Sequence, residues 1–202
     1  MQLRPHQEQA LQAMTDNDKG QVIVPTGGGK TMCMIMDAVK QLEDYGTVVV
    51  VAPRILLAEQ LHKEFMEIVD TRHTDVSTMH VHSGKIKGVF SSTNPLEIQQ
   101  FVECTYNKTI IFTTYHSLHR IEQSGIDVDT IYFDEAHNSV QSNFLPAVKH
   151  FSNYANRKYF FTATPKNSNI PDMGMNGKTF GKVIAQVPAP DLIAKGLSLI
   201  HI

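Results

Sequence analysis

The segment VIVPTGGGKT ends an apolar run with three glycines, a lysine and a threonine. Such glycines let successive backbone N–H groups turn inward around phosphate oxygens, and a helix that follows adds the positive end of its dipole. Lys30 would reach the outer phosphates as a point charge, and the Thr31 hydroxyl would bind Mg²⁺. The candidate nucleotide-binding residues of this loop are Thr26, Gly27, Gly28, Gly29, Lys30 and Thr31.

The loop matches the strict phosphate-loop pattern only in part. That pattern places glycine at position 24, where this chain has Val24. The alternative is a glycine-rich strand-to-helix turn that binds no ligand. The apolar run immediately before the glycines favours the phosphate site.

A pair of carboxylates follows a second apolar run, in TIYFDEAHN from Thr130 to Asn138. Asp134 and Glu135 then lie at the carboxyl end of a strand, the edge of a parallel sheet at which ligands bind. Asp134 could hold Mg²⁺ through its water shell, and Glu135 could orient or deprotonate an attacking water. The alternative is a solvated Asp-Glu pair at a strand end, which the glycine loop upstream disfavours.

Short apolar runs that alternate with amphipathic segments must position these residues. We expect strands at Gln21–Val24, Thr47–Ala52, Val76–His82, Thr109–Thr113, Thr130–Phe133, Lys158–Thr162 and Val183–Gln186. We expect helices at Lys30–Leu42, Ile55–Val69, Pro95–Cys104, Tyr115–Glu122, Asn143–Phe151 and Pro188–Gly196, with a loop at Lys166–Gly181. Continuous apolar strands separated by helices predict an α/β fold, a three-layer α/β/α sandwich around a doubly wound, mostly parallel sheet.

Composition sets wider limits. The 202 residues, 42% hydrophobic and 19% charged, suit one large α/β domain or two small ones. A net charge of −2 argues against a protein that coats nucleic acid by bulk charge, but allows a local groove. Cys33 and Cys104 are predicted to be free thiols. With no secretory signal and no apolar run of about 18 residues, we expect a cytoplasmic protein without a membrane partner.

Three motifs together resemble a known family. PTGGGKT (Pro25–Thr31), DEAH (Asp134–His137) and TATP (Thr162–Pro165) resemble motifs I, II and III of the first RecA-like domain of superfamily 2 helicases and translocases, a P-loop NTPase fold. Members of that family often lack the first glycine of the loop, which accounts for Val24. The resemblance covers about residues 3–165, and the motifs stand in the family's order.

The opening segment LRPHQEQAL resembles the adenine-recognition segment of the branch that includes type I and III restriction translocases and XPB-like and RecG-like motors. The resemblance implies that Gln7 reads the adenine, with Arg4 nearby. VVVVAPRILLAEQ resembles motif Ia and IIFTTYHSL the Ib region, which in relatives touch the sugar–phosphate backbone. The nucleic-acid contacts implied in this way are Pro53, Arg54, Thr113 and Thr114.

By the same resemblance, His137, Thr162 and Thr164 couple the nucleotide to the nucleic-acid groove. It further implies ATP and Mg²⁺ as cofactors, and DNA or RNA as a partner bound with little sequence specificity. A second RecA-like domain, in the same chain or another, would supply arginine fingers. We expect residues 1–187 to form the first RecA-like domain and 188–202 to begin the connection to the second.

Three alternatives remain open at this stage. The domain could belong to a double-strand DNA translocase of a restriction or repair complex, or to a non-catalytic scaffold gated by nucleotide. Two histidine pairs could also bind a metal, because His80 and His82 share a face of a predicted strand and His116 and His119 lie one helical turn apart. Neither pair has an evident third ligand at a matching spacing.

Overall fold

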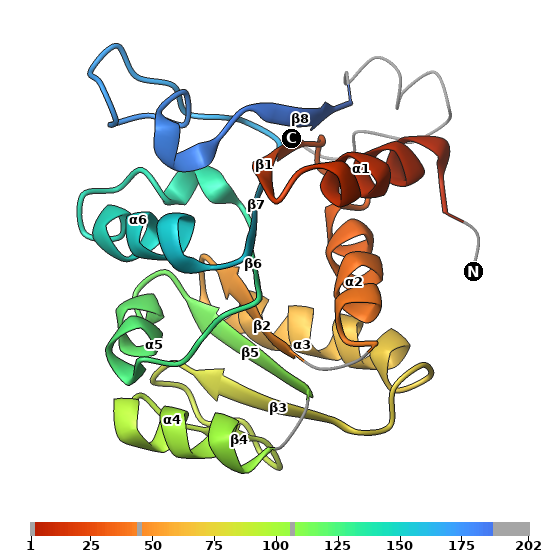
Figure 1. Cartoon of the computed structure of the whole chain (residues 1–202), viewed down its shortest axis with the longest axis vertical. Helices are drawn as coiled ribbons and strands as arrows, with labels where there is room; N and C mark the ends of the chain where they lie inside the picture. Colours follow the sequence, from red (N-terminus) through yellow and green to blue (C-terminus); the bar gives the residue numbers. More distant parts are fainter. Residues whose placement is uncertain (1–2, 44–45, 106–107, 188–202) are drawn as a thin grey trace.

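The computed structural model of the chain describes residues 3–43, 46–105 and 108–187. Its centre is one sheet of eight strands in the order β4-β3-β5-β2-β6-β7-β1-β8, and all seven strand pairs are parallel (Figure 1). The strands are β1 (Lys19–Ile23), β2 (Gly46–Ala52), β3 (Val76–Val81), β4 (Phe90–Ser91), β5 (Lys108–Thr114), β6 (Thr130–Phe133), β7 (Arg157–Thr162) and β8 (Val183–Gln186).

Six helices cover the sheet: α1 (Pro5–Asp16), α2 (Lys30–Gln41), α3 (Ile55–Val69), α4 (Pro95–Cys104), α5 (Leu118–Ser124) and α6 (Leu145–Tyr154). Figure 1 shows α1, α2 and α3 on one side of the sheet and α4, α5 and α6 on the other. Strand β2 explains this division, because its side chains alternate between two cores. Val48, Val50 and Ala52 join the core under α1 to α3, whereas Val49 and Val51 join the core under α4 to α6. The predicted three-layer, doubly wound fold is confirmed.

Helix α1 was not predicted. Its buried positions are His6, Gln7, Ala10 and Met14, so the face that packs on the domain is half polar. A proline in its first turn and the acceptance of the Arg4 N–H by Gln7 Oε1 at 2.9 Å start the helix. The hydrophobic periodicity that marks the other helices is therefore weak here.

Other boundaries moved by a few residues. Helix α5 begins at Leu118 rather than at Tyr115, because the Tyr115 N–H still pairs with the Ala52 carbonyl at the end of the sheet. The predicted loop at Lys166–Gly181 contains one 3₁₀ turn, Lys178–Phe180, and buries Met175 and Phe180 in the core. The helix predicted at Pro188–Gly196 lies outside the described residues.

The strand order divides the carboxyl edge of the sheet into two halves. Strands β3, β5 and β2 end side by side, with Val81 opposite Thr113 and Thr114 opposite Ala52. Strands β6, β7 and β1 form the neighbouring half, where Ile23 stands opposite Thr162. The implied nucleic-acid segments leave the first half, and the phosphate loop and the carboxylate pair leave the second.

In the ranges that the structure describes, no helix combines the length and the apolar character that a membrane span requires.

Candidate phosphate-binding site

The loop between β1 and α2 has the backbone geometry that a phosphate site needs. Gly27 and Gly29 have positive φ angles of 78° and 84°, a conformation that favours glycine. Gly29 is also the N-cap of α2. The first N–H groups of this helix therefore face the loop without a capping side chain, as an anion site requires.

The first turn of α1 is tied to this loop by two side chains. Gln7 is 6% exposed and donates from Nε2 to the Gly29 carbonyl at 3.3 Å. His6 is equally buried, and its Nε2 is hydrogen-bonded to the Gly28 carbonyl at 2.8 Å. A Cβ atom placed on Gly29 would collide with Gln7 Nε2. Gln7 thus lies beside the phosphate loop, while Arg4 is exposed at the start of the helix.

His6 is a site residue that the sequence reasoning missed. Its only signal is its position next to Gln7 in LRPHQEQAL. One residue later on a helix points about 100° further round, so both side chains can reach the loop from one turn.

Lys30 lies between the loop and the carboxylate pair. It is 9% exposed, and its Nζ is 3.4 Å from Glu135 Oε1 and 3.4 Å from the Val24 carbonyl. An ammonium held at this position, above the glycine loop, suits the negative charge of a nucleotide's phosphates.

A cavity of about 740 Å³ opens at this point and is large enough for a nucleotide's phosphates and a hydrated metal ion. Three segments line it: the loop and start of α2, the strand end after β6, and one face of α3. The lining residues are Thr26, Gly27, Gly29, Lys30, Thr31, Met32, Ile35, Gln60, Glu64, Glu67, Ile68, Asp134 and Glu135.

The carboxylate pair is held in an unusual backbone conformation. Glu135 has φ 45° and ψ 52°, in the left-handed region that non-glycine residues seldom adopt. Such a conformation costs on the order of 1–3 kcal/mol and is concentrated at functional sites. The neighbouring Asp134 carbonyl accepts a hydrogen bond from the Tyr115 hydroxyl at 2.8 Å, which anchors the turn.

Burial raises the pKa of the Asp134 carboxyl to about 6; the Glu135 charge adds to the rise and Lys30 opposes it. A half-buried carboxylate that is costly to ionise alone gains from a cation beside it. The side chains therefore fit Mg²⁺, since Thr31 and Asp134 both line the cavity and both offer hard oxygen ligands.

His137 joins the carboxylate pair to the end of β7. Its Nδ1 lies 3.5 Å from Glu135 Oε2 and 3.1 Å from Thr162 Oγ1. Thr162 is fully buried, and its Oγ1 accepts the N–H of Thr164 at 3.1 Å. The structure thus connects the three predicted coupling residues to one another and to Glu135.

The other half of the edge holds the implied nucleic-acid contacts. Arg54 is exposed at the N-cap of α3, and Pro53 is half-buried beside it. Thr113 is fully buried and donates its only hydroxyl proton to the Val81 carbonyl at 2.8 Å. Its hydroxyl proton is therefore already engaged in this arrangement, and a phosphate contact by Thr113 stays a prediction. Thr114, at the strand end, is 4% exposed.

Comparison with known proteins identifies the family. Residues 1–167 match the family described as Type III restriction enzyme, res subunit. The chain belongs to this family. The match agrees with the motifs and with the α/β sheet, and the chain has the fold of the N-terminal RecA-like domain of superfamily 2 helicases.

A relative with an assigned activity is similar to this chain over part of its own length. The chain is 25% identical over 154 residues to the ATP-dependent RNA helicase SrmB of Escherichia coli (strain K12), which covers 73% of this chain and 34% of SrmB. The chain therefore spans about a third of that relative.

Solved structures share the fold. The Type ISP restriction-modification enzyme LlaGI, in complex with a DNA substrate mimic, matches with a TM-score of 0.72 at 22% identity, over 98% of this chain and 21% of that one. The Pyrococcus furiosus Hef helicase domain matches with 0.61 at 22% identity, over 83% and 34%. The UvsW helicase of bacteriophage T4 matches with 0.65 at 15% identity, over 91% and 60%.

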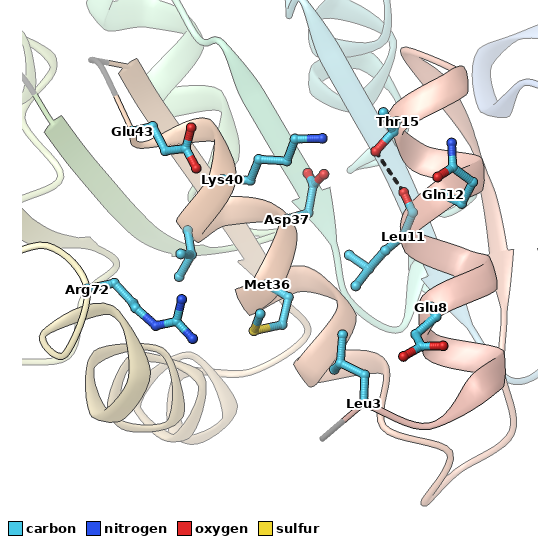
Figure 2. Close-up of a pocket in the computed structure, with 11 residues that line it drawn as sticks. Leu3, Glu8, Leu11, Gln12, Thr15, Met36, Asp37, Lys40, Glu43 and Arg72 are labelled. Atoms are coloured by element: carbon cyan, nitrogen blue, oxygen red, sulfur yellow. Dashed lines mark hydrogen bonds between the residues drawn. The ribbon is translucent and has the colours of Figure 1, made fainter. Parts of the chain in front are cut away.

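A second cavity in this helicase-like domain, of about 420 Å³, lies between α1 and α2. Figure 2 shows Leu3, Leu11 and Met36 facing the space between the two helices, with charged side chains around them. It shares no lining residue with the phosphate cavity, so we do not assign nucleotide to it.

Neither histidine pair gains a third metal ligand in the part of the chain that the structure describes. Among residues 3–43, 46–105 and 108–187, no group of three or more His, Cys, Asp or Glu side chains is arranged to hold a metal ion. His80 and His82 are instead hydrogen-bonded to each other.

Proposed function

We propose that this chain is the first motor domain of an ATP-driven helicase, and that it binds ATP with Mg²⁺ and hydrolyses it to move along DNA or RNA. The observation that carries the proposal is the approach of Lys30 to Glu135 across a cavity that Thr31 and Asp134 also line. A nucleophile-activating carboxylate, a phosphate-binding lysine and metal-binding oxygens then surround one space.

Each residue has a role that follows from its position. The N–H groups of the glycine loop and the start of α2 would hold the phosphate oxygens, and Lys30 would neutralise the outer phosphates. Thr31 and Asp134 would hold Mg²⁺, whose charge supports the transfer of the terminal phosphoryl group. Glu135 would orient and deprotonate the attacking water. Gln7, on α1 beside the loop, would read the adenine.

Nucleic acid would bind along the other half of the edge. The exposed guanidinium of Arg54 stands at the N-terminus of α3, and both can hold a backbone phosphate. Pro53 and Thr114 would flank this contact. Since such contacts touch no bases, binding should have little sequence preference and should weaken with salt.

We further propose that residues 1–187 are the first RecA-like domain, that 188–202 begin a connection, and that a second RecA-like domain completes the site. An arginine finger contributes about 10³–10⁵ in rate, so the 202 residues alone should bind ATP weakly and hydrolyse it slowly. ATPase assays with and without single-stranded DNA test this. Fast, DNA-stimulated turnover by these residues alone would contradict the need for a second domain.

A double-strand DNA translocase is the second candidate, because the family match and the LlaGI structure both come from restriction enzymes. The two motors are separated by what they displace. A helicase releases one strand of a duplex, whereas a translocase removes a third strand from a triplex without parting the duplex. A scaffold that only binds nucleotide would do neither and would show no turnover.

A further inference from the structure

Three histidines outside the phosphate site form a continuous hydrogen-bonded chain. His80 Nδ1 lies 2.9 Å from His82 Nε2, and His80 Nε2 lies 2.7 Å from His62 Nδ1. His80 is fully buried and His82 is 2% exposed. The rings of His62 and His80 both stack on Phe112 of β5, with centroids 4.8 and 5.4 Å away. Helix α3 supplies His62, and strand β3 and its end supply the others.

A backbone group fixes the direction of every bond in this chain. The Gly84 N–H, which can only donate, donates to His82 Nδ1 at 3.1 Å. The proton of neutral His82 must therefore be on Nε2, from which it is donated to His80 Nδ1. By the same step His80 donates from Nε2 to His62 Nδ1, and His62 faces Thr78 Oγ1 with its Nε2 at 3.4 Å. All three rings thus carry their proton on Nε2.

The histidine chain links the nucleic-acid half of the sheet edge to the helix that lines the phosphate cavity. Gly84 follows β3 at the nucleic-acid half, and a Cβ atom on it would press against Ile55, next to Arg54. At the other end, His62 belongs to α3, whose Gln60 and Glu64 line the phosphate cavity. Helix α3 therefore begins at the proposed nucleic-acid contact, lines the proposed nucleotide cavity and carries His62, the last ring of the histidine chain.

We propose that His62, His80 and His82 are positioning residues, which hold the turn at Gly84 and helix α3 in one fixed arrangement through a one-way chain of neutral imidazoles. The hydrogen-bond distances among His62, His80 and His82 support the histidine chain without reference to the proposed function. Its consequence, a properly placed nucleic-acid contact at Arg54, rests on the proposed function.

The histidine chain can pass a change of tautomer from one ring to the next, because each neutral ring has one donor and one acceptor. If His62 lost its acceptor, His80 could move its proton to Nδ1, and His82 would then have to accept at Nε2 and carry its own proton on Nδ1. That proton would face the Gly84 N–H, and the turn would lose the hydrogen bond from the Gly84 N–H to His82 Nδ1. Protonation of any of the three rings has the same result, since it places a second donor opposite an existing one.

The surroundings keep the rings neutral. Burial lowers the pKa of His80 to about 3, helped by the neighbouring histidines, and burial also lowers the pKa of His82 and His62. The charged groups that act on the pKa values of these rings come from α3 and its C-cap: Glu59 acts on His82, and Asp70 and Lys63 act on His62. Strand β5 contributes only the apolar ring of Phe112.

Nitrogen NMR of the histidine rings in the 202-residue chain tests the assignment directly. We expect His62, His80 and His82 to show a protonated Nε2 and a bare Nδ1 at pH 7.5, and His80 to stay neutral at pH 5. A bare Nε2 on any of the three, or a His80 that titrates near its ordinary 6.5, would overturn the proposal. This measurement needs neither nucleotide nor nucleic acid.

Two substitutions at one position test the consequence. His62→Phe keeps a ring to stack on Phe112 but removes the acceptor, whereas His62→Asn keeps an acceptor close to the Nδ1 position. We expect His62→Phe to speed hydrogen exchange of the Gly84 amide and to weaken single-stranded DNA binding by roughly fivefold, the factor for one average hydrogen bond. His62→Asn should stay within about twofold of the natural chain on both measures.

His150→Phe is the matched control, because His150 lies on α6 across the sheet and pairs with Glu122 at 3.4 Å. It should change neither measure. Unchanged Gly84 exchange in His62→Phe would refute the positioning role. If the natural chain binds no DNA or RNA, the proposed function fails, while ring tautomers and Gly84 exchange still decide the histidine chain.

Discussion

The ammonium of Lys30 and the carboxylate of Glu135 lie 3.4 Å apart, although one follows β1 and the other follows β6. Strand β7 stands between these two strands in the sheet. The two side chains meet only because parallel strands end at a common edge. Under the proposed function, a terminal phosphate and its attacking water would bind at this point.

Glu135→Gln removes the proposed base and keeps the shape of the side chain. We expect ATP turnover to fall at least about 100-fold while ATP affinity stays within about threefold. Steady-state ATPase rates and equilibrium nucleotide binding measure the two effects. Glu67→Gln, on the α3 wall of the same cavity, is the control and should leave turnover nearly unchanged. Full activity in Glu135→Gln would remove Glu135 from the role of base.

Gly29→Ala should damage both the loop and its contact with α1. Alanine at a φ of 84° costs about 1–2 kcal/mol, and the new methyl group would also push Gln7 away from the loop. Gly88→Ala is the matched control, since Gly88 has a φ of 82° but open space around its position. We expect a larger loss of unfolding free energy, and a loss of ATP binding, for Gly29→Ala alone. Chemical denaturation and nucleotide titration compare the two variants, and equal costs would contradict the packing of Gln7 on the loop.

Removing one partner of the buried ion pair between Asp37 and Arg157 should destabilise the domain. Asp37 is 2% exposed, accepts two guanidinium bonds at 2.9 Å and accepts the Tyr132 hydroxyl at 2.6 Å. Asp37→Leu leaves the Arg157 guanidinium, which is 14% exposed, without its carboxylate, so we expect a loss of about 3–5 kcal/mol of unfolding free energy.

The ion pair of Lys108 with Asp75, at 3.3 Å, provides the comparison for this prediction, because its lysine is buried but its carboxylate is 55% exposed. Water already solvates the exposed Asp75 carboxylate, so Asp75→Leu should cost less unfolding free energy than Asp37→Leu. The double variant Asp37→Leu with Arg157→Met should recover much of the loss, because no unpaired charge remains. Urea denaturation of the unchanged protein, the two single variants and the double variant measures these unfolding free energies. Equal losses at Asp37 and Asp75 would contradict the role proposed for the ion pair of Asp37.

Acid should weaken the fold through the histidine chain. The pKa of His80 is about 3 in the folded protein and near 6.5 when unfolded. Between these values the unfolded state binds more protons, so the unfolding free energy is complete above about pH 6.5 and declines as the pH falls toward 3. Denaturation between pH 7.5 and pH 4.5 should show this slope, and His80→Gln should flatten it. An equal slope in both proteins would show that other groups cause it.

The sequence by itself determined the fold class, the order of the motifs and most strands, because continuous apolar runs and glycine-rich turns are local signals. Strand Thr130–Phe133 and helices Ile55–Val69 and Pro95–Cys104 were predicted with the observed bounds. Helix α1 was missed because its buried face carries His6 and Gln7, and burial of polar side chains leaves no hydrophobic period.

Only the tertiary structure decided which of the candidate side chains have partners and of what kind. In the folded protein the Thr113 hydroxyl donates to the Val81 carbonyl of the neighbouring strand. The fold also places His62 of α3 next to His80, which is hydrogen-bonded to His82. The order of the strands and the packing of α3 on the sheet set these contacts. Neither the strand order nor the packing of α3 can be predicted from local residue spacing. Both depend on residues that are far apart in the chain and meet only when the helices pack on the two faces of the sheet.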